Sequence, residues 1–165
     1  MKKYFTIILL FFGLTGFSQT QYTINLEGAF QFYNYKSISL GVSINKPNSW
    51  KIKKADTFIK SVVYFERFIN NTDIEKINVL GCSALFGTKY FNIGINLRHL
   101  FLNKIHRLDL GPMFRLGYKY AWVSYSIDLT AFDNPYSTSQ KNIINLNKYE
   151  SNIKLIVTLP IFNKK

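Results

Sequence analysis

The sequence predicts an all-β fold, and two observations carry that prediction. Apolar and polar side chains alternate with a period of two over most of the chain, and no amphipathic helical stretch of useful length interrupts them. Because successive side chains of a strand point to opposite faces, each alternating run is expected to be a strand with one apolar and one polar face. The abundance of Tyr (11) and Phe (15), with 18% charged residues, argues against a disordered chain.

Residues 1–18 have the features of a secretory signal peptide. Two lysines open the chain, an apolar stretch follows at 4–14, and the small residues Gly16 and Ser18 stand just before a cleavage point. The apolar stretch is too short to span a bilayer as a helix, so we expect cleavage rather than anchoring. The expected mature chain is 19–165, a single domain in an exported protein.

Five runs alternate most clearly, and each is predicted to contain strand. They cover residues 22–32, 37–45, 90–100, 107–122 and 152–161. Two further stretches, 57–69 and 74–86, are apolar enough for strands but mix their faces. Seven strands are thus expected directly. An eighth is expected either from 118–127, separating from the long run, or from Ile143 to Leu146.

The predicted connections are of unequal length. Residues 70–73 (Asn-Asn-Thr-Asp) and 87–89 (Gly-Thr-Lys) have the composition of short turns. Residues 46–56 and 128–141 are predicted to be longer loops. Pro112 lacks a backbone donor, which predicts a bulge within its strand.

The polar faces favour the interior of a narrow barrel over the surface of a soluble sheet. They consist of Ser, Gly, Asn, Thr and Gln with isolated charges. Strands of about nine to eleven residues cross a bilayer when tilted. Aromatic residues that suit a membrane interface gather towards the run ends, at Tyr33, Tyr35, Tyr90, Tyr118, Tyr120, Trp122 and Tyr125.

On these features the chain resembles the small outer-membrane β-barrel proteins of Gram-negative bacteria. The matching elements are Phe17-Ser18-Gln19 at the end of the leader, the hairpin-rich alternation, and the strand from Leu110 to Tyr118. The resemblance implies an antiparallel up-and-down barrel of about eight strands, with a filled polar interior and a place in the cell outer membrane. Two features depart from the pattern of these barrels. Their last strand usually closes on an aromatic residue, whereas here Phe162 is followed by three more residues and falls out of the alternation to which Ile161 belongs. The predicted connections also do not alternate between short and long.

Five charged residues on the polar faces form the first candidate site. In a narrow barrel interior, unpaired charges are costly, so they are expected to pair across strands and close any pore. The alternative is that they are solvated charges on the outside of a soluble sheet. The residues are Glu27, Arg98, Asp109, Arg115 and Lys119.

A basic patch in the expected 46–56 loop forms the second candidate site. It comprises Lys46, Lys51, Lys53 and Lys54, with Trp50 beside them. Such a patch suits anionic lipid headgroups or the phosphates of lipopolysaccharide, the alternative being a solvated loop. The net charge of +12 does not indicate a nucleic-acid partner, because the chain is expected to be exported.

No enzymatic chemistry, cofactor or metal is expected. Acyl-transfer chemistry needs a serine, a histidine and an orienting group within reach, and the candidates are His99, His106, Ser124 and Ser126. His99 shares the parity of the apolar face, which separates it from a serine. Two histidines and one cysteine, Cys82, are a poor set for a transition metal.

The expected function is therefore that of an outer-membrane barrel with a structural or surface-interaction role and no open pore. The first alternative is a soluble periplasmic barrel that binds a small or lipidic ligand. A membrane-embedded lipid hydrolase is the more distant alternative.

Overall fold

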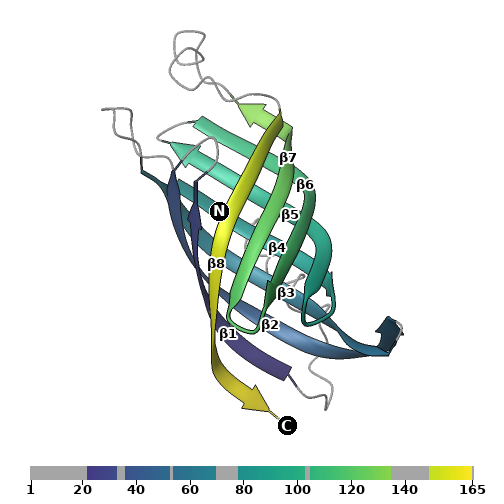
Figure 1. Ribbon diagram of the computed structural model, residues 1–165. Helices are drawn as coiled ribbons and strands as arrows, with labels where there is room; N and C mark the ends of the chain where they lie inside the picture. The colour runs from purple at the N-terminus through teal and green to yellow at the C-terminus, as the bar shows by residue number, and fades with distance from the viewer. Residues whose placement is uncertain are drawn as a thin grey trace.

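The computed structural model describes residues 22–32, 36–52, 54–69, 78–102, 105–134 and 149–164. They form eight antiparallel strands in one closed barrel (Figure 1). The strands are β1 (Tyr22–Gln31), β2 (Ser37–Ile52), β3 (Ala55–Phe68), β4 (Asn78–Gly87), β5 (Phe91–Leu102), β6 (Ile105–Tyr118), β7 (Ala121–Asn134) and β8 (Tyr149–Lys164).

Each strand pairs with the next along the chain, and β8 pairs with β1 to close the barrel. This is the up-and-down order in which all neighbours are antiparallel, so the all-β prediction and the expected eight strands are confirmed. The eighth strand is β7, which separates from the long run, as the first of the two alternatives has it. The expected signal peptide and residues 143–146 lie outside the described residues. None of the described segments is a helix of the length and apolarity that crossing a membrane requires.

The connections at one end of the barrel are all short, and all but one of those at the other end are longer. Between β2 and β3, β4 and β5, and β6 and β7 lie two, three and two residues; we call this end, which also holds the start of β1 and the end of β8, the turn end. At the opposite end, the loop end, the connections have five, nine, two and fourteen residues. The expected short first and long second connection is therefore wrong, and the alternation is broken instead at the two-residue β5–β6 connection.

The predicted loop at 46–56 is wrong because β2 and β3 continue as a paired hairpin through most of it. Their pairing runs on from Lys46↔Ile59 to Ile52↔Ala55, with a register shift between Asn48 and Lys51. This pairing extends beyond the last β1–β2 pair, Thr23↔Asn45, so the hairpin projects past the neighbouring strand (Figure 1). Likewise, the predicted loop at 128–141 is in part the end of β7, which continues to Asn134.

The run 107–122 is two strands joined by a tight turn, not one. The turn consists of Lys119 and Tyr120, and Lys119 has a φ of 50°. Non-glycine residues seldom adopt such a φ, so a turn without Gly or Asn has no sequence signal. The indole Nε1 of Trp122 donates a hydrogen bond to the carbonyl oxygen of Lys119 at 3.2 Å, which stabilises the turn.

A bulge near the end of β8 explains the parity of Phe162. Ile24 pairs with Phe162 while Asn25 pairs with Pro160, so Ile161 is an extra residue in β8. Both Ile161 and Phe162 are consequently exposed, and the Phe162 ring lies 5.9 Å from that of Tyr22. Between β6 and β7 the register shifts at Leu108/Asp109, where Ala131 of β7 is the extra residue, and not at Pro112, so the bulge predicted there is absent from this pairing.

Candidate functional site: the ionic interior of the barrel

Among the described residues, ten charged side chains are buried in the barrel interior, five acidic and five basic. Their formal charges cancel, so the net charge of +12 comes wholly from residues elsewhere in the chain. Buried ions are tolerated only when they are paired, and this equality allows each charge a partner. The ten are Glu27, Lys60, Glu66, Arg98, Arg107, Asp109, Arg115, Asp128, Glu150 and Lys154.

The group nearer the turn end is a triad of Glu27, Lys60 and Arg115, from β1, β3 and β6. Nη1 of Arg115 donates to Oε2 of Glu27 at 2.9 Å, and Nζ of Lys60 forms an ion pair with Oε1 of the same carboxylate. The Lys60 ammonium also lies 5.7 Å from the centre of the Trp122 ring, within cation–π range. One carboxylate thus pairs with two cations across the interior.

The larger group, nearer the loop end, is centred on Arg98. Its Nη1 lies 3.1 Å from Oδ2 of Asp128 and 3.7 Å from Oε2 of Glu150, while Nη2 lies 3.7 Å from Oε2 of Glu66. Lys154 completes the pairing of Glu66 through a 2.5 Å contact. The guanidinium therefore joins carboxylates from β3, β7 and β8.

Polar side chains donate hydrogen bonds to Asp128 of this group. Asp128 accepts hydrogen bonds from the amides of Asn96 (3.1 Å) and Asn152 (2.7 Å) and from Ser126 (3.1 Å). Arg107 bonds Asp109 at 2.6 Å and reaches Glu150, in the Arg98 group, at 3.5 Å. Such neutral donors offset part of the cost of burying a carboxylate.

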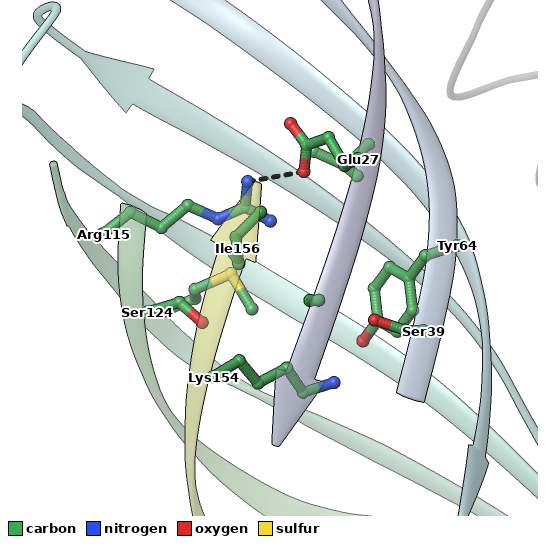
Figure 2. A pocket seen from close by; sticks show the side chains of 10 residues that line it. Glu27, Ser39, Tyr64, Arg115, Ser124, Lys154 and Ile156 are labelled. Carbon is green, nitrogen blue, oxygen red and sulfur yellow. Dashed lines mark hydrogen bonds and ion pairs between the residues drawn. The ribbon is translucent and has the colours of Figure 1, made fainter. Parts of the chain in front are cut away.

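Buried apolar and aromatic side chains also occupy the interior. Val62, Tyr64, Leu85 and Met113 form a buried cluster in the interior. Beside it is a cavity of about 20 Å³, bordered by the Glu27–Arg115 pair and by Lys154 (Figure 2). This volume accommodates one water molecule and is far below the few hundred Å³ of ligand pockets.

The outer surface has the opposite character. Many large apolar side chains of the described residues are exposed, including Leu40, Ile95, Leu129 and Val157 in the middle portions of their strands. Exposed ionisable side chains of the same part of the chain lie near strand ends and in turns: Lys36, Lys51, Lys54, Asp56, Arg67, Lys89 and Lys119. The molecule is thus charged inside and apolar outside.

The structure places four of the five charged residues of the first candidate site in the interior: Glu27, Arg98, Asp109 and Arg115. It does not bring them into a single group, because Glu27 pairs with Arg115 while Arg98 lies among other carboxylates. Lys119 does not belong with them. It is exposed in the β6–β7 turn, because the strand ends at Tyr118 and its alternation ends there too.

Sequence reasoning missed six members of the interior network. Lys154 and Arg107 lie on the polar faces of alternating runs, and Asp128 continues the parity of Ser124 and Ser126, so alternation alone contained a signal for these three. The signal is weaker for the others, because the stretch of β3 around Lys60 mixes buried and exposed positions. The six are Lys60, Glu66, Arg107, Asp128, Glu150 and Lys154.

The second candidate site lies along the projecting β2–β3 hairpin. Trp50 is 71% exposed, and its ring meets that of Phe86 edge-on at a centroid distance of 6.2 Å. Lys51 and Lys54 are exposed, and Nζ of Lys51 lies 3.7 Å from Oδ1 of Asp56. Lys46 is half-buried in β2, and Lys53 lies outside the described residues.

The barrel wall separates the histidines from the serines. Ser124 and Ser126 are buried inside, whereas His99 is half-buried and His106 exposed on the outer surface, with Nε2 of His99 3.3 Å from Nδ1 of His106. Within the described ranges no group of three or more metal-ligating side chains is present.

Fold and interior together define a closed eight-stranded barrel with an ionic core and an apolar outer wall. Comparisons with family models, curated proteins and solved structures return no match. The function is accordingly inferred from the geometry of the barrel.

Proposed function

We propose that the protein is an outer-membrane β-barrel with a structural or surface-interaction role and no open pore. The observation that supports this most strongly is the inverted distribution of polarity, with ions buried and large apolar side chains exposed. Water-soluble proteins rarely expose contiguous apolar patches of more than a few hundred Å². A lipid environment removes that cost, and closure of the sheet leaves no unpaired edge in it.

The connection lengths also support insertion in this membrane. Outer-membrane barrels have short turns on the periplasmic side and longer loops outside. Here the turn end has connections of two or three residues, and three of the four loop-end connections are longer. On this basis the turn end faces the periplasm.

The filled interior supports the absence of a pore and disfavours the ligand-binding alternative. Eight strands enclose a space that side chains just fill, and here two charged groups and an apolar cluster occupy it. The cavity that the described residues line beside the apolar cluster, of about 20 Å³, has no room for a small-molecule or lipidic ligand.

Arginine substitutions on the outer wall test this proposal. Ile95 and Val157, in β5 and β8, are 51% and 54% exposed. In a soluble protein, Ile95→Arg or Val157→Arg should change stability by less than about 0.5 kcal/mol, as at other surface positions. If these side chains face the bilayer midplane, each change should cost roughly 2–4 kcal/mol of folding into phospholipid vesicles.

The matched control is Tyr120→Arg, which puts the same charge at the turn end. Tyr120 is similarly exposed, and an arginine at the interface should cost at most about 1 kcal/mol. Recovery of the wild-type protein as a soluble species without detergent, with all three variants equally stable, would contradict membrane insertion.

A further inference from the structure

Each turn at the turn end presents lysine next to aromatic residues. Lys54 follows Trp50 on the β2–β3 hairpin, Lys89 precedes Tyr90 between β4 and β5, and Lys119 lies between two tyrosines after β6; all these side chains are exposed. Aromatic side chains with a polar atom settle at the headgroup level of a membrane, where lysine ammonium groups also remain hydrated. This end therefore has the composition of a membrane interface.

The second and third turns are joined in a compact cluster of Lys89, Tyr90, Tyr118 and Lys119. The rings of Tyr90 and Tyr118 are stacked, with centroids 5.4 Å apart and planes inclined by 15°. The Lys89 ammonium lies 5.0 Å from the Tyr90 ring centre, and that of Lys119 lies 5.2 Å from the Tyr118 ring centre. The cluster thus consists of two stacked phenol rings flanked by two cations.

Backbone hydrogen bonds hold this cluster in place. Gly117 donates to the carbonyl of Tyr90 at 3.0 Å, which ties the β4–β5 turn to β6. Thr158 of β8 donates to the carbonyl of Tyr120 at 2.8 Å, which fixes the β6–β7 turn. Because both turns are anchored, the two ammonium groups are presented together without ordering of a long loop.

The charge of the cluster is not neutralised within the described part of the protein. No carboxylate there forms an ion pair with Lys89 or Lys119, and the exposed acid at this end, Asp56, lies beside Lys51. The interior acids cannot serve either, since they are buried and paired with interior bases. Each exposed ammonium group beside a tyrosine ring offers an anionic phosphate an opposite charge, and ammonium groups and phenol hydroxyls are both hydrogen-bond donors.

We propose that the cluster of Lys89, Tyr90, Tyr118 and Lys119 binds the phosphate headgroups of anionic glycerophospholipids in the leaflet at the turn end. This inference rests on the proposed function, which places the turn end on the periplasmic side. That leaflet consists of phospholipid, whereas lipopolysaccharide belongs to the opposite leaflet. The cluster therefore meets phospholipid phosphates first.

Lipid selectivity of the reconstituted protein tests the proposal. The protein is inserted in phosphatidylcholine vesicles, and spin-labelled phosphatidylglycerol or phosphatidylcholine reports which lipid is immobilised at its surface. The wild type should favour phosphatidylglycerol roughly threefold to fivefold, since a basic residue near an anionic membrane strengthens association by about that factor. Because the interaction is electrostatic and exposed, 1 M salt should remove most of the preference.

The test variant combines Lys89→Gln with Lys119→Asn, because asparagine tolerates the positive φ of residue 119. It should bind both lipids about equally. The matched control combines Lys36→Gln with Arg67→Gln, which removes two exposed charges at the loop end and should leave the preference intact.

Four outcomes would overturn the inference. The first is a wild type without lipid preference, and the second is a preference that the test variant retains. The third is a preference for lipid A over phosphatidylglycerol that the test variant loses, because this would assign the cluster to the other leaflet. The fourth is failure of the wild type to enter the bilayer, which overturns the proposed function as well. The first three leave membrane insertion standing.

Discussion

Replacing Glu27 by glutamine tests whether the interior triad is desolvated as its geometry indicates. The carboxylate is 5% exposed and lies against two cations, with Arg115 at 2.9 Å and Lys60 on its other oxygen. Removing its charge leaves two buried cations facing each other. Breaking a buried ion pair from one side costs about 3–5 kcal/mol, so Glu27→Gln should lower the free energy of unfolding by that amount.

The assay is urea unfolding of the protein in vesicles or detergent, followed by Trp fluorescence and by mobility on an unboiled denaturing gel. The Lys60 ammonium lies 5.7 Å from the centre of the Trp122 ring, so the Trp122 signal responds to the triad, whereas the exposed Trp50 adds a signal from the hairpin. The matched control is Asp56→Asn, which breaks a pair of the same chemistry at 3.7 Å on the surface, where the Asp56 side chain is 81% exposed. An exposed pair contributes at most about 1 kcal/mol.

A triple variant separates lost pairing from lost packing. Glu27→Leu with Lys60→Met and Arg115→Met removes all three charges and keeps most of the volume. Replacing a whole buried ionic group by apolar residues is often neutral or stabilising, so the triple variant should recover much of the loss. If Glu27→Gln unfolds at the same urea concentration as Asp56→Asn, the triad is solvated and the reasoning is refuted.

Three further predictions follow from the interior and the turns. An ideal Cβ on Gly81 would lie 2.2 Å from Cζ of Tyr64, so Gly81→Val should cost about 1–3 kcal/mol in urea unfolding. Tyr64→Leu should relieve part of that cost. Gly28→Val should be nearly neutral, because nothing lies within 4 Å of an added Cβ there. Equal effects at both glycines would contradict this reasoning. In planar bilayers the protein should produce no large, stable single-channel currents, because two ionic groups and an apolar cluster fill the interior. Such currents would show that the interior is open. Lys119→Gly should raise the free energy of unfolding by up to about 1 kcal/mol, since glycine adopts a φ of 50° without steric cost. Lys119→Val should lower the free energy of unfolding. The opposite order would contradict the turn geometry.

The strand content of this barrel follows from local alternation, but several boundaries do not. Alternation predicts the separation of β7 from the long run only as one of two alternatives, because Lys119 adopts a positive φ that lysine does not signal. Residues 46–56 have the composition of a loop, with a proline at position 47 and several lysines, yet most of them pair in the β2–β3 hairpin. In both cases cross-strand hydrogen bonds and packing outweigh the local preference of the residues.

The interior site was partly predictable for the same reason. The alternation along each strand is enough to place Glu27, Arg98 and Arg115 on the polar face. A shift of one residue in strand register would turn all apolar side chains of the strand to the opposite face of the sheet. Parity fails in β3, where Lys60, Ser61 and Val62 are buried in succession, and thus Lys60 was missed. Pairing partners are not predictable from any single strand.

By itself, the sequence determines that this protein is built of strands with one apolar and one polar face, because side chains of a strand alternate whatever the strand packs against. Only the tertiary structure decides that the sheet closes, that the polar face points inward, and that Glu27 meets Arg115 across 88 positions of the chain. Closure sets strand tilt and stagger, and these bring particular charges of distant strands to the same depth. That depth is a property of the whole barrel, so no local stretch of sequence encodes it.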